Sequence, residues 1–191
     1  MRILFIVFLF LQSVFLFSQN KVEKETEIPA NMFPKQAVAY VLDLLPEGKV
    51  FWIKEENESG LSYEAKFKLE NKWYSIEFDE YGRLEDAEVS MAKKELEGSI
   101  LKKIKSTLSK DFEKYKILKI QRQWRGNPET VKKLIQEKKE SEGEGIEVYY
   151  EIVVQTFVNK AYSDYEYLFD FQGVFVRKIK FQQTSDDHLL Y

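Results

Sequence analysis

Residues 63–82 read YEAKFKLENKWYSIEFDEYG, and their alternation of apolar and charged side chains decides the class of fold. A period of two is typical of strands with one buried face, so the stretch predicts two antiparallel strands joined near Asn71. Asp79 and Gly82 then match a type I turn, in which aspartate comes first and glycine, which tolerates positive φ, comes fourth. We expect a hairpin there, leading into a third strand over residues 84–89.

An amphipathic helix is predicted before these strands. It starts at Pro34, because proline is favourable in the first turn of a helix, and it ends before Pro46 and Gly48. Its apolar positions follow the spacing of one helix face, at Ala37, Val38, Val41, Leu44 and Leu45. The apolar residues 50–53 that follow predict a further strand.

The same order of elements recurs in the second half of the chain. A second amphipathic helix is predicted over residues 95–110, and strands are predicted at 115–124, 146–158, 165–171 and 174–181. Phe78-Asp79-x-x-Gly82 has its counterpart in Phe169-Asp170-x-x-Gly173. The sequence therefore predicts an α+β fold of two tandem repeats, each a helix packed on an antiparallel sheet of about four strands.

The residues of the first half resemble a known family. The order is a helix, a strand with tryptophan (50–52), the Tyr-Glu-Ala-Lys-Phe strand (63–67) and Ile-Glu-Phe-Asp-Glu-Tyr-Gly (76–82). It is similar to the PepSY-like exported proteins of bacteria, whose tandem repeats resemble those of the β-lactamase inhibitor protein. The resemblance covers about residues 34–182. It implies small, extracytoplasmic, non-catalytic domains that bind proteins or peptides, and it carries over no catalytic residue.

The first residues have the anatomy of a secretory signal peptide. Arg2 precedes the apolar run 3–11, and Ser18 is a small residue suited to the position before a cut. Cleavage near Ser18 would release a protein into the periplasm or the medium with no stable membrane span; an uncleaved N-terminal anchor is the alternative. The expected division of the chain is a signal peptide (1–18), a flexible lead-in (19–33), a first PepSY-like repeat (34–92), a second PepSY-like repeat (93–182) with an insertion (126–145), and a tail (183–191).

Composition argues against several classes of protein. The 29 basic and 32 acidic residues are interspersed, with a net charge of −3, whereas nucleic-acid binding needs a basic footprint. There is no cysteine, so disulfides, zinc–cysteine sites and thiol nucleophiles are excluded. The one histidine, His188, follows two aspartates in the tail, which leaves a weak metal site as a disfavoured alternative. We therefore expect no enzyme activity, no cofactor and no metal.

Carboxylates on the predicted strands invite comparison with the paired acids of glycoside hydrolases. Glu64, Glu77 and Glu88, however, alternate with apolar residues, which predicts that they lie on a solvated face of the sheet. Cross-strand pairing with Lys66 and Lys68 then accounts for them.

The strand at 146–158 is apolar on both faces. A sheet covered by one helix layer needs one apolar face, so the second is either covered within the chain or binds a partner. Tyr150, Ile152, Val154 and Val158 form one face, and Tyr149, Val153 and Phe157 form the other. Trp124, in the strand predicted at 115–124, adds a further aromatic residue. The candidate binding residues are therefore Tyr149, Phe157, Trp124 and Val153.

The insertion 126–145 is open to two interpretations. Asn127 and Pro128 favour a short capped helix, which could be a charged surface element or mobile loop, or could contact a partner. Taken together, the sequence predicts a non-catalytic extracytoplasmic module that binds a protein or peptide. Alternatives are a proteinaceous inhibitor of a hydrolase, and a metal-dependent sensor or enzyme, which the scarcity of histidine and cysteine disfavours.

Overall fold

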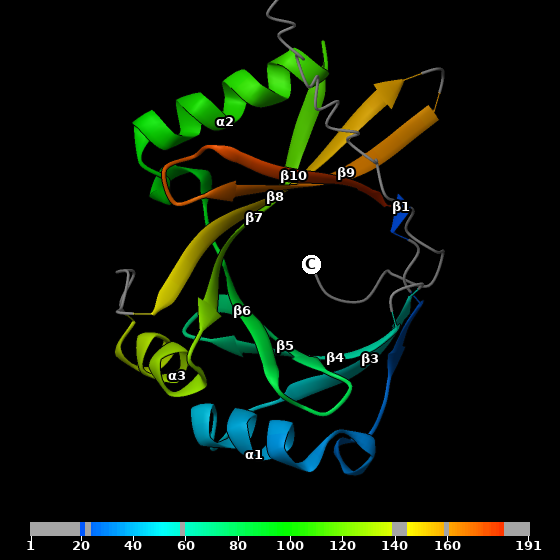
Figure 1. Ribbon diagram of the computed structural model, residues 1–191, viewed down its shortest axis with the longest axis vertical. Coiled ribbons are helices and arrows are strands. Elements are labelled where there is room, and N and C mark those ends of the chain that lie inside the picture. The colour runs from blue at the N-terminus through cyan, green and yellow to red at the C-terminus, as the bar shows by residue number, and fades with distance from the viewer. Residues whose placement is uncertain (1–19, 22–23, 58–59, 139–144, 159–160, 182–191) are drawn as a thin grey trace, which may run out of the picture.

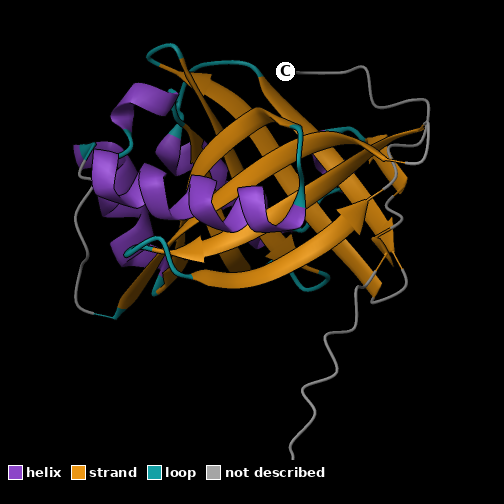
Figure 2. Cartoon of the chain, turned by 90° about the horizontal axis from the view of Figure 1, so that it is seen from above, coloured by secondary structure: helices purple, strands orange, loops and turns teal. Residues whose placement is uncertain are grey.

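The protein has an α+β fold dominated by one large sheet. The computed structural model describes residues 20–21, 24–57, 60–138, 145–158 and 161–181. Over these residues it contains ten strands in a single sheet, three α-helices and two short 3-10 helices. The strands curve round with the helices on their outer side (Figure 1), and Figure 2 shows the helices gathered towards one end of the strands.

Both halves of the chain run from a helix into four strands. The first half comprises a 3-10 helix (Ala30–Met32), α1 (Lys35–Leu44), β3 (Val50–Asn57), β4 (Gly60–Leu69), β5 (Lys72–Asp79) and β6 (Leu84–Ser90). The second half comprises a 3-10 helix (Lys93–Glu95), α2 (Gly98–Asp111), β7 (Tyr115–Gly126), α3 (Pro128–Glu137), β8 (Ile146–Val158), β9 (Ala161–Asp170) and β10 (Phe175–Phe181). The helix α3 interrupts the second half between its first two strands.

The strands of the two halves form one continuous sheet. Its order is β1-β10-β9-β8-β7-β6-β5-β4-β3-β2, and each pair from β10 to β2 is antiparallel. The halves meet where Ala87–Ser90 of β6 pair with Gln121–Trp124 of β7. The strands predicted as about four for each half are thus joined side by side in one sheet.

The N-terminal segment connects the two edges of this sheet. In place of a flexible lead-in, it contains β1 (Asn20–Lys21), parallel to β10, and β2 (Lys24–Glu27), antiparallel to β3. Three Cα–Cα steps separate Lys21 from Lys24, so these residues are at most about 11 Å apart. Ten strands laid flat would hold the edges about 43 Å apart. The sheet must therefore roll until its edges approach each other.

The outer face of the sheet carries two hydrophobic cores. The first lies under α1 and α3 and includes Phe67, Ile76, Phe78 and Trp124. The second lies under α2 and is built around Ile104, Leu108, Ile152, Tyr167 and Phe169. In both cores, apolar residues of the helices pack against apolar residues of the strands.

The insertion contributes to the first core. Asn127 caps α3 by accepting hydrogen bonds from the backbone N–H groups of Glu129 and Thr130, at 3.0 and 3.2 Å. The helix buries Val131, Leu134 and Ile135 against that core. The described part of the insertion is therefore a packed helix with one charged face; residues 139–144 lie outside the described residues.

The two predicted turns are built alike. Asp79 Oδ1 accepts hydrogen bonds from the backbone N–H groups of Tyr81 and Arg83, and Asp170 Oδ1 accepts them from Gln172 and Val174. The fourth residues, Gly82 and Gly173, have φ of 80° and 76°. Each glycine faces the helix of its own half: a Cβ would lie 2.6 Å from Pro34 Cβ at Gly82, and 3.1 Å from Ile100 Cγ2 at Gly173.

We therefore expect Gly82→Ala to destabilise the protein by about 1–3 kcal/mol, because alanine at this positive φ is strained and its methyl group meets the start of α1. Urea unfolding followed by circular dichroism measures the change. Gly98→Ala is the matched control, since Gly98 is helical and nothing lies within 4 Å of the added methyl group; we expect it to be neutral or to stabilise by up to about 1 kcal/mol. Equal effects of the two substitutions would contradict the proposed contact.

None of the helices in the described part of the chain is long and apolar enough to cross a membrane.

Candidate functional site

The face of the sheet opposite the helices is the candidate functional site, and we call it the inner face. Strand register defines it. Trp52, Ala65, Ile76, Ala87, Trp124 and Val148 form a cross-strand row in the first core. Side chains alternate along a strand, so the neighbouring rows point the other way. One of them is Lys66, Ser75, Glu88, Gln123, Tyr149 and Asp170.

The inner face is polar and yet largely buried. Its buried polar residues are Glu55, Glu64, Ser75, Asp86, Glu88, Gln121, Gln123, Glu151 and Glu166. Glu64 and Glu88 are only 5% and 3% exposed, so the predicted solvated face is wrong for these two, although the predicted side of the sheet is right. The reason is the rolling of the sheet, which turns this face towards itself.

One group of carboxylates on this face surrounds a lysine. Single oxygens of Glu25, Glu55 and Glu64 lie within 4.8 Å of one another. Lys66 Nζ lies 2.7 Å from Glu64 and 3.8 Å from Glu25, and Ser75 Oγ donates a hydrogen bond to Glu64. Burial opposes the charge of Glu64, but Lys66 outweighs it and leaves the pKa of Glu64 below its usual value. In this lysine cluster, the ion pair with Lys66 holds Glu64 in its charged form.

A second group, which we call the carboxylate cluster, consists of Glu77, Asp86 and Glu88 on β5 and β6. Single oxygens of these residues also lie within 4.8 Å of one another. Burial, and then the charge of Glu77, raise the pKa of Asp86 well above its usual value. Burial, and then the charge of Asp86, do the same for the pKa of Glu88. Like charges held together away from water disfavour the ionised form.

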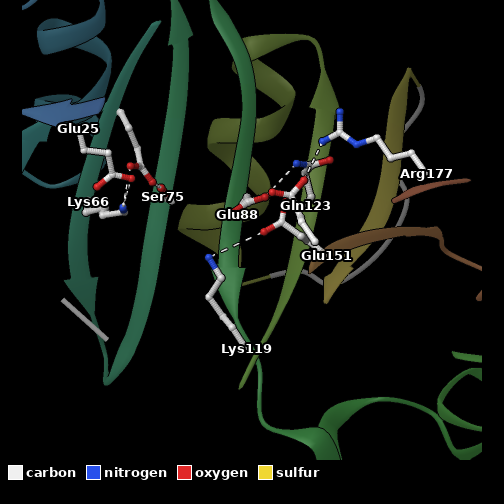
Figure 3. A network of polar contacts seen from close by, with 10 residues as sticks. Glu25, Lys66, Ser75, Glu88, Lys119, Gln123, Glu151 and Arg177 are labelled. Carbon is white, nitrogen blue, oxygen red and sulfur yellow. Dashed lines mark hydrogen bonds and ion pairs between the residues drawn. The ribbon is translucent and has the colours of Figure 1, made fainter. Parts of the chain in front are cut away.

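The negative charge continues from this cluster across β7 to β9. Burial, followed by the charges of Glu88 and Glu166, raises the pKa of Glu151 well above its usual value. Basic groups approach from the periphery: Arg125 lies 3.6 Å from Asp86, Lys119 lies 3.8 Å from Glu151, and Arg177 lies 3.1 Å from Glu166. Figure 3 shows Lys66 close beside Glu25 and Ser75, whereas Lys119 and Arg177 reach the Glu88–Glu151 region from its edges.

Gln123 joins the carboxylate cluster from β7. It is 2% exposed and pairs directly with Glu88 in the sheet. Its side-chain Nε2–H donates a hydrogen bond of 2.9 Å to Glu88 Oε1 (Figure 3). The other atom of the amide, Oε1, is buried and has no hydrogen-bond partner among the described residues. A buried acceptor without a donor is uncommon and calls for an explanation.

The candidate binding residues predicted from the sequence are only partly brought together. Tyr149, Val153 and Phe157 share the inner face of β8, but Tyr149 and Phe157 are eight residues apart, about 27 Å along the strand. Val153 is buried at 8% exposure. Trp124 lies on the opposite face, 3% exposed in the first core under α3, so it is separated from the other three by the sheet itself.

Phe157 has an aromatic neighbour that was not among the predicted binding residues. Tyr162 on β9 pairs with it in the register, and the ring centroids are 5.0 Å apart. Phe157 is 57% exposed and Tyr162 72% exposed. We call this pair the aromatic rim. Two rings directly opposite across a hairpin could have been found by pairing the residues outward from the connection between the two strands.

The predicted His188 site lies outside the described residues. No histidine or cysteine occurs among the residues the structure describes, so the polar chemistry of the inner face rests on carboxylates, amides, hydroxyls, lysine and arginine. Such a face can bind cations and basic side chains through its oxygen atoms.

Comparison with protein families and with curated proteins finds no match. Solved structures of similar fold include a DUF2874 family protein from Bacteroides uniformis ATCC 8492, with 13% identity, 77% of this chain and 88% of that chain covered, and a TM-score of 0.51. A DUF2874 family protein from Bacteroides ovatus ATCC 8483 has 12% identity, 77% and 86% coverage, and a TM-score of 0.49. A BLIP-like protein from Bacteroides fragilis NCTC 9343 has 13% identity, 84% and 93% coverage, and a TM-score of 0.48.

These likenesses concern the fold alone, because the identities are 12–13%. The resemblance to PepSY-like proteins and to the repeats of the β-lactamase inhibitor protein therefore stays a prediction.

Proposed function

We propose that this chain is a non-catalytic binding module that takes a protein or peptide partner on the aromatic rim and the adjoining inner face. The observation that carries this proposal is the exposure of Phe157 and Tyr162 beside each other at the end of β8 and β9. Exposed aromatic rings next to a polar surface are the usual anchors of protein interfaces.

The burial of the inner face limits the chemistry of the partner. Glu151 and Glu166 lie on the same two strands as the aromatic pair but are only 7% and 9% exposed, so charged groups of a partner do not reach them. The partner is therefore expected to contact the two rings through apolar or aromatic side chains.

Two further predictions belong to this proposal. The signal-like residues 1–18 support export, with cleavage near Ser18 and action in the periplasm or the medium. The repeated order of helix, strands and Asp-x-x-Gly turn supports an origin by duplication of one helix-on-sheet unit. Superposition of residues 34–92 on residues 93–182, leaving out α3, would test the repeat.

The rim is tested by the double variant Phe157→Ser/Tyr162→Ser, which we expect to lose at least tenfold in partner affinity because both anchors are removed. Residues 19–191 serve as bait for an extracytoplasmic extract, captured proteins are identified by mass spectrometry, and the affinity for a purified partner is then measured by calorimetry. If the partner is a hydrolase, its activity at a one-to-one ratio shows whether binding inhibits it.

Tyr81→Ser is the matched control. Tyr81 is 65% exposed, which is between the values of the two rim residues, but it lies on the turn between β5 and β6. It should bind the partner as the wild type does. Thermal unfolding verifies that both variants fold, as the exposure of the substituted rings leads us to expect. Full affinity in the rim variant would refute the proposed surface.

A further inference from the structure

The carboxylate cluster is compact enough for its oxygens to surround one calcium ion. Oxygens of Glu77, Asp86 and Glu88 all lie within 4.8 Å of one another. Two ligands on opposite sides of a Ca²⁺ ion, each at about 2.4 Å, are about 4.8 Å apart. One ion can therefore reach all three oxygens with the backbone of β5 and β6 in place.

An independent observation points to a ligand at the same place. Gln123 Oε1 is buried and without a hydrogen-bond partner among the described residues, whereas the Nε2 of the same amide is bonded to Glu88 Oε1. The two atoms of an amide are about 2.3 Å apart, which keeps Oε1 within about 5 Å of Glu88 Oε1. Asp86 Oδ1 is a second buried acceptor for which the described residues offer no partner. Amide and carboxylate oxygens are the ligands that Ca²⁺ prefers.

The charges around the cluster leave room for a divalent ion. Five carboxylates gather here, from Glu77, Asp86, Glu88, Glu151 and Glu166. The basic groups that approach them are Lys119, Arg125 and Arg177, at 3.1–3.8 Å from single carboxylates. A divalent cation among these carboxylates would offset the repulsion between their charges.

The lysine cluster shows how a cation is held among carboxylates in the same sheet. There the Lys66 ammonium lies 2.7 Å from Glu64. In the carboxylate cluster, Arg125 lies 3.6 Å from Asp86. Glu77 is partly exposed and gives an ion a route from solvent.

We propose that Glu77, Asp86, Glu88 and the side-chain carbonyl of Gln123 bind one Ca²⁺ ion, which ties β5, β6 and β7 together across the junction of the two halves. The set is all oxygen, which selects a hard cation over zinc or copper. Ca²⁺ is favoured over Mg²⁺ because it accepts irregular sets of oxygen ligands, whereas Mg²⁺ demands a near-ideal octahedron and keeps several of its waters. The site is independent of the aromatic rim and of any protein partner.

Equilibrium dialysis with radioactive Ca²⁺ tests the site on the chain of residues 19–191, freed of metal by a chelator. We expect saturation at one ion per chain with a dissociation constant no weaker than about 1 mM, the range of extracellular calcium modules. The double variant Asp86→Asn/Glu88→Gln should bind at least tenfold more weakly. It should still fold, since it removes two charges that repel each other.

Glu55→Gln, in the lysine cluster, is the matched control and should keep the wild-type affinity. Thermal unfolding is compared without Ca²⁺ and with 5 mM Ca²⁺, about five times that dissociation constant. The Tm of the wild type and of Glu55→Gln should rise with Ca²⁺, and the Tm of the double variant should not. No saturable binding up to 10 mM, about ten times the weakest expected constant, would overturn the proposal. Unchanged binding by the double variant, or loss of binding by Glu55→Gln, would overturn it as well. Because no partner enters the assay, its result is separate from that of the rim experiment.

Discussion

Trp124→Ala should destabilise the protein by about 3–5 kcal/mol, the usual effect of deleting a buried large aromatic side chain. Trp124 is 3% exposed and packs in the first core with Ala87 and Val148 as its cross-strand neighbours. The loss would take a large share of the roughly 5–15 kcal/mol that stabilises a typical domain. Urea unfolding followed by tryptophan fluorescence and circular dichroism measures the change.

Two variants sharpen this prediction. Trp124→Phe keeps most of the volume and removes an indole N–H that is buried without a partner among the described residues, so its effect should stay within about 1.5 kcal/mol. Phe157→Ala truncates an aromatic ring that is 57% exposed, and we expect a change within about 0.5 kcal/mol. If Trp124→Ala kept wild-type stability and lost a binding partner, the tryptophan would belong to an interface after all.

The local features of the fold could be predicted from the sequence because each rests on residues close together in the chain. The alternation over residues 63–82 predicts β4 and β5, and the structure has them at Gly60–Leu69 and Lys72–Asp79. The turn after Asp170 follows in the same way, since aspartate caps it and Gly173 has the required positive φ. Local steric rules and side-chain period suffice for such elements.

The long-range features could not be predicted in this way. β1 and β2 lie in a polar segment, NKVEKETE, that has no apolar alternation. They exist because the backbone edges of β10 and β3 supply hydrogen-bond partners. Edge pairing depends on where two distant strands end in space. The rolling of the sheet follows from the same closure, and no residue pattern records it.

The candidate site shows the same division. Period-two alternation places Glu64 and Glu88 on the face away from the helices, as the structure has them. Their burial could not be predicted, because it depends on how far the sheet curls. The difference between the two carboxylates depends on the register: Glu64 lies beside Lys66, whereas Glu88 lies beside Gln123 and near Asp86. Two chemically identical residues on one face thus have opposite electrostatic surroundings.

That contrast predicts opposite effects of one substitution at the two positions. Glu88→Gln should stabilise the metal-free protein at neutral pH by about 1–3 kcal/mol, because it removes a buried charge beside Asp86 and still accepts the hydrogen bond from Gln123. Glu64→Gln should destabilise by about 1–3 kcal/mol, because it leaves the largely buried ammonium of Lys66 without its nearest carboxylate, at 2.7 Å. Both are measured by urea unfolding in the presence of a chelator.

The pH dependence follows from the same groups. The pKa values of Asp86, Glu88 and Glu151 are raised in the folded state. At a pH between their unfolded pKa values, near 4, and their folded pKa values, the native protein therefore holds more protons than the unfolded chain. Its free energy of unfolding therefore falls as pH rises through that window. The pKa of Glu64 is lowered, so its contribution is complete above about pH 5 and is lost only at lower pH.

Unfolding measurements should accordingly show that the wild type is more stable at pH 5.5 than at pH 8. Glu88→Gln should reduce this difference in the free energy of unfolding, because it removes one titrating group and one of the charges that raise the pKa values of the others. The charge of Lys119 acts in the opposite direction on Glu88 and Glu151, and that of Arg125 on Asp86, but the pKa values of all three carboxyl groups remain raised, so the sign does not change. Glu64→Gln should leave the difference unchanged. Two outcomes would contradict this prediction: a wild type that is more stable at pH 8, or a Glu88→Gln variant that keeps the full wild-type difference between the two pH values. Either would mean that these carboxylates are ionised and solvated in the folded protein. The carboxylate cluster would then have no electrostatic need for a cation.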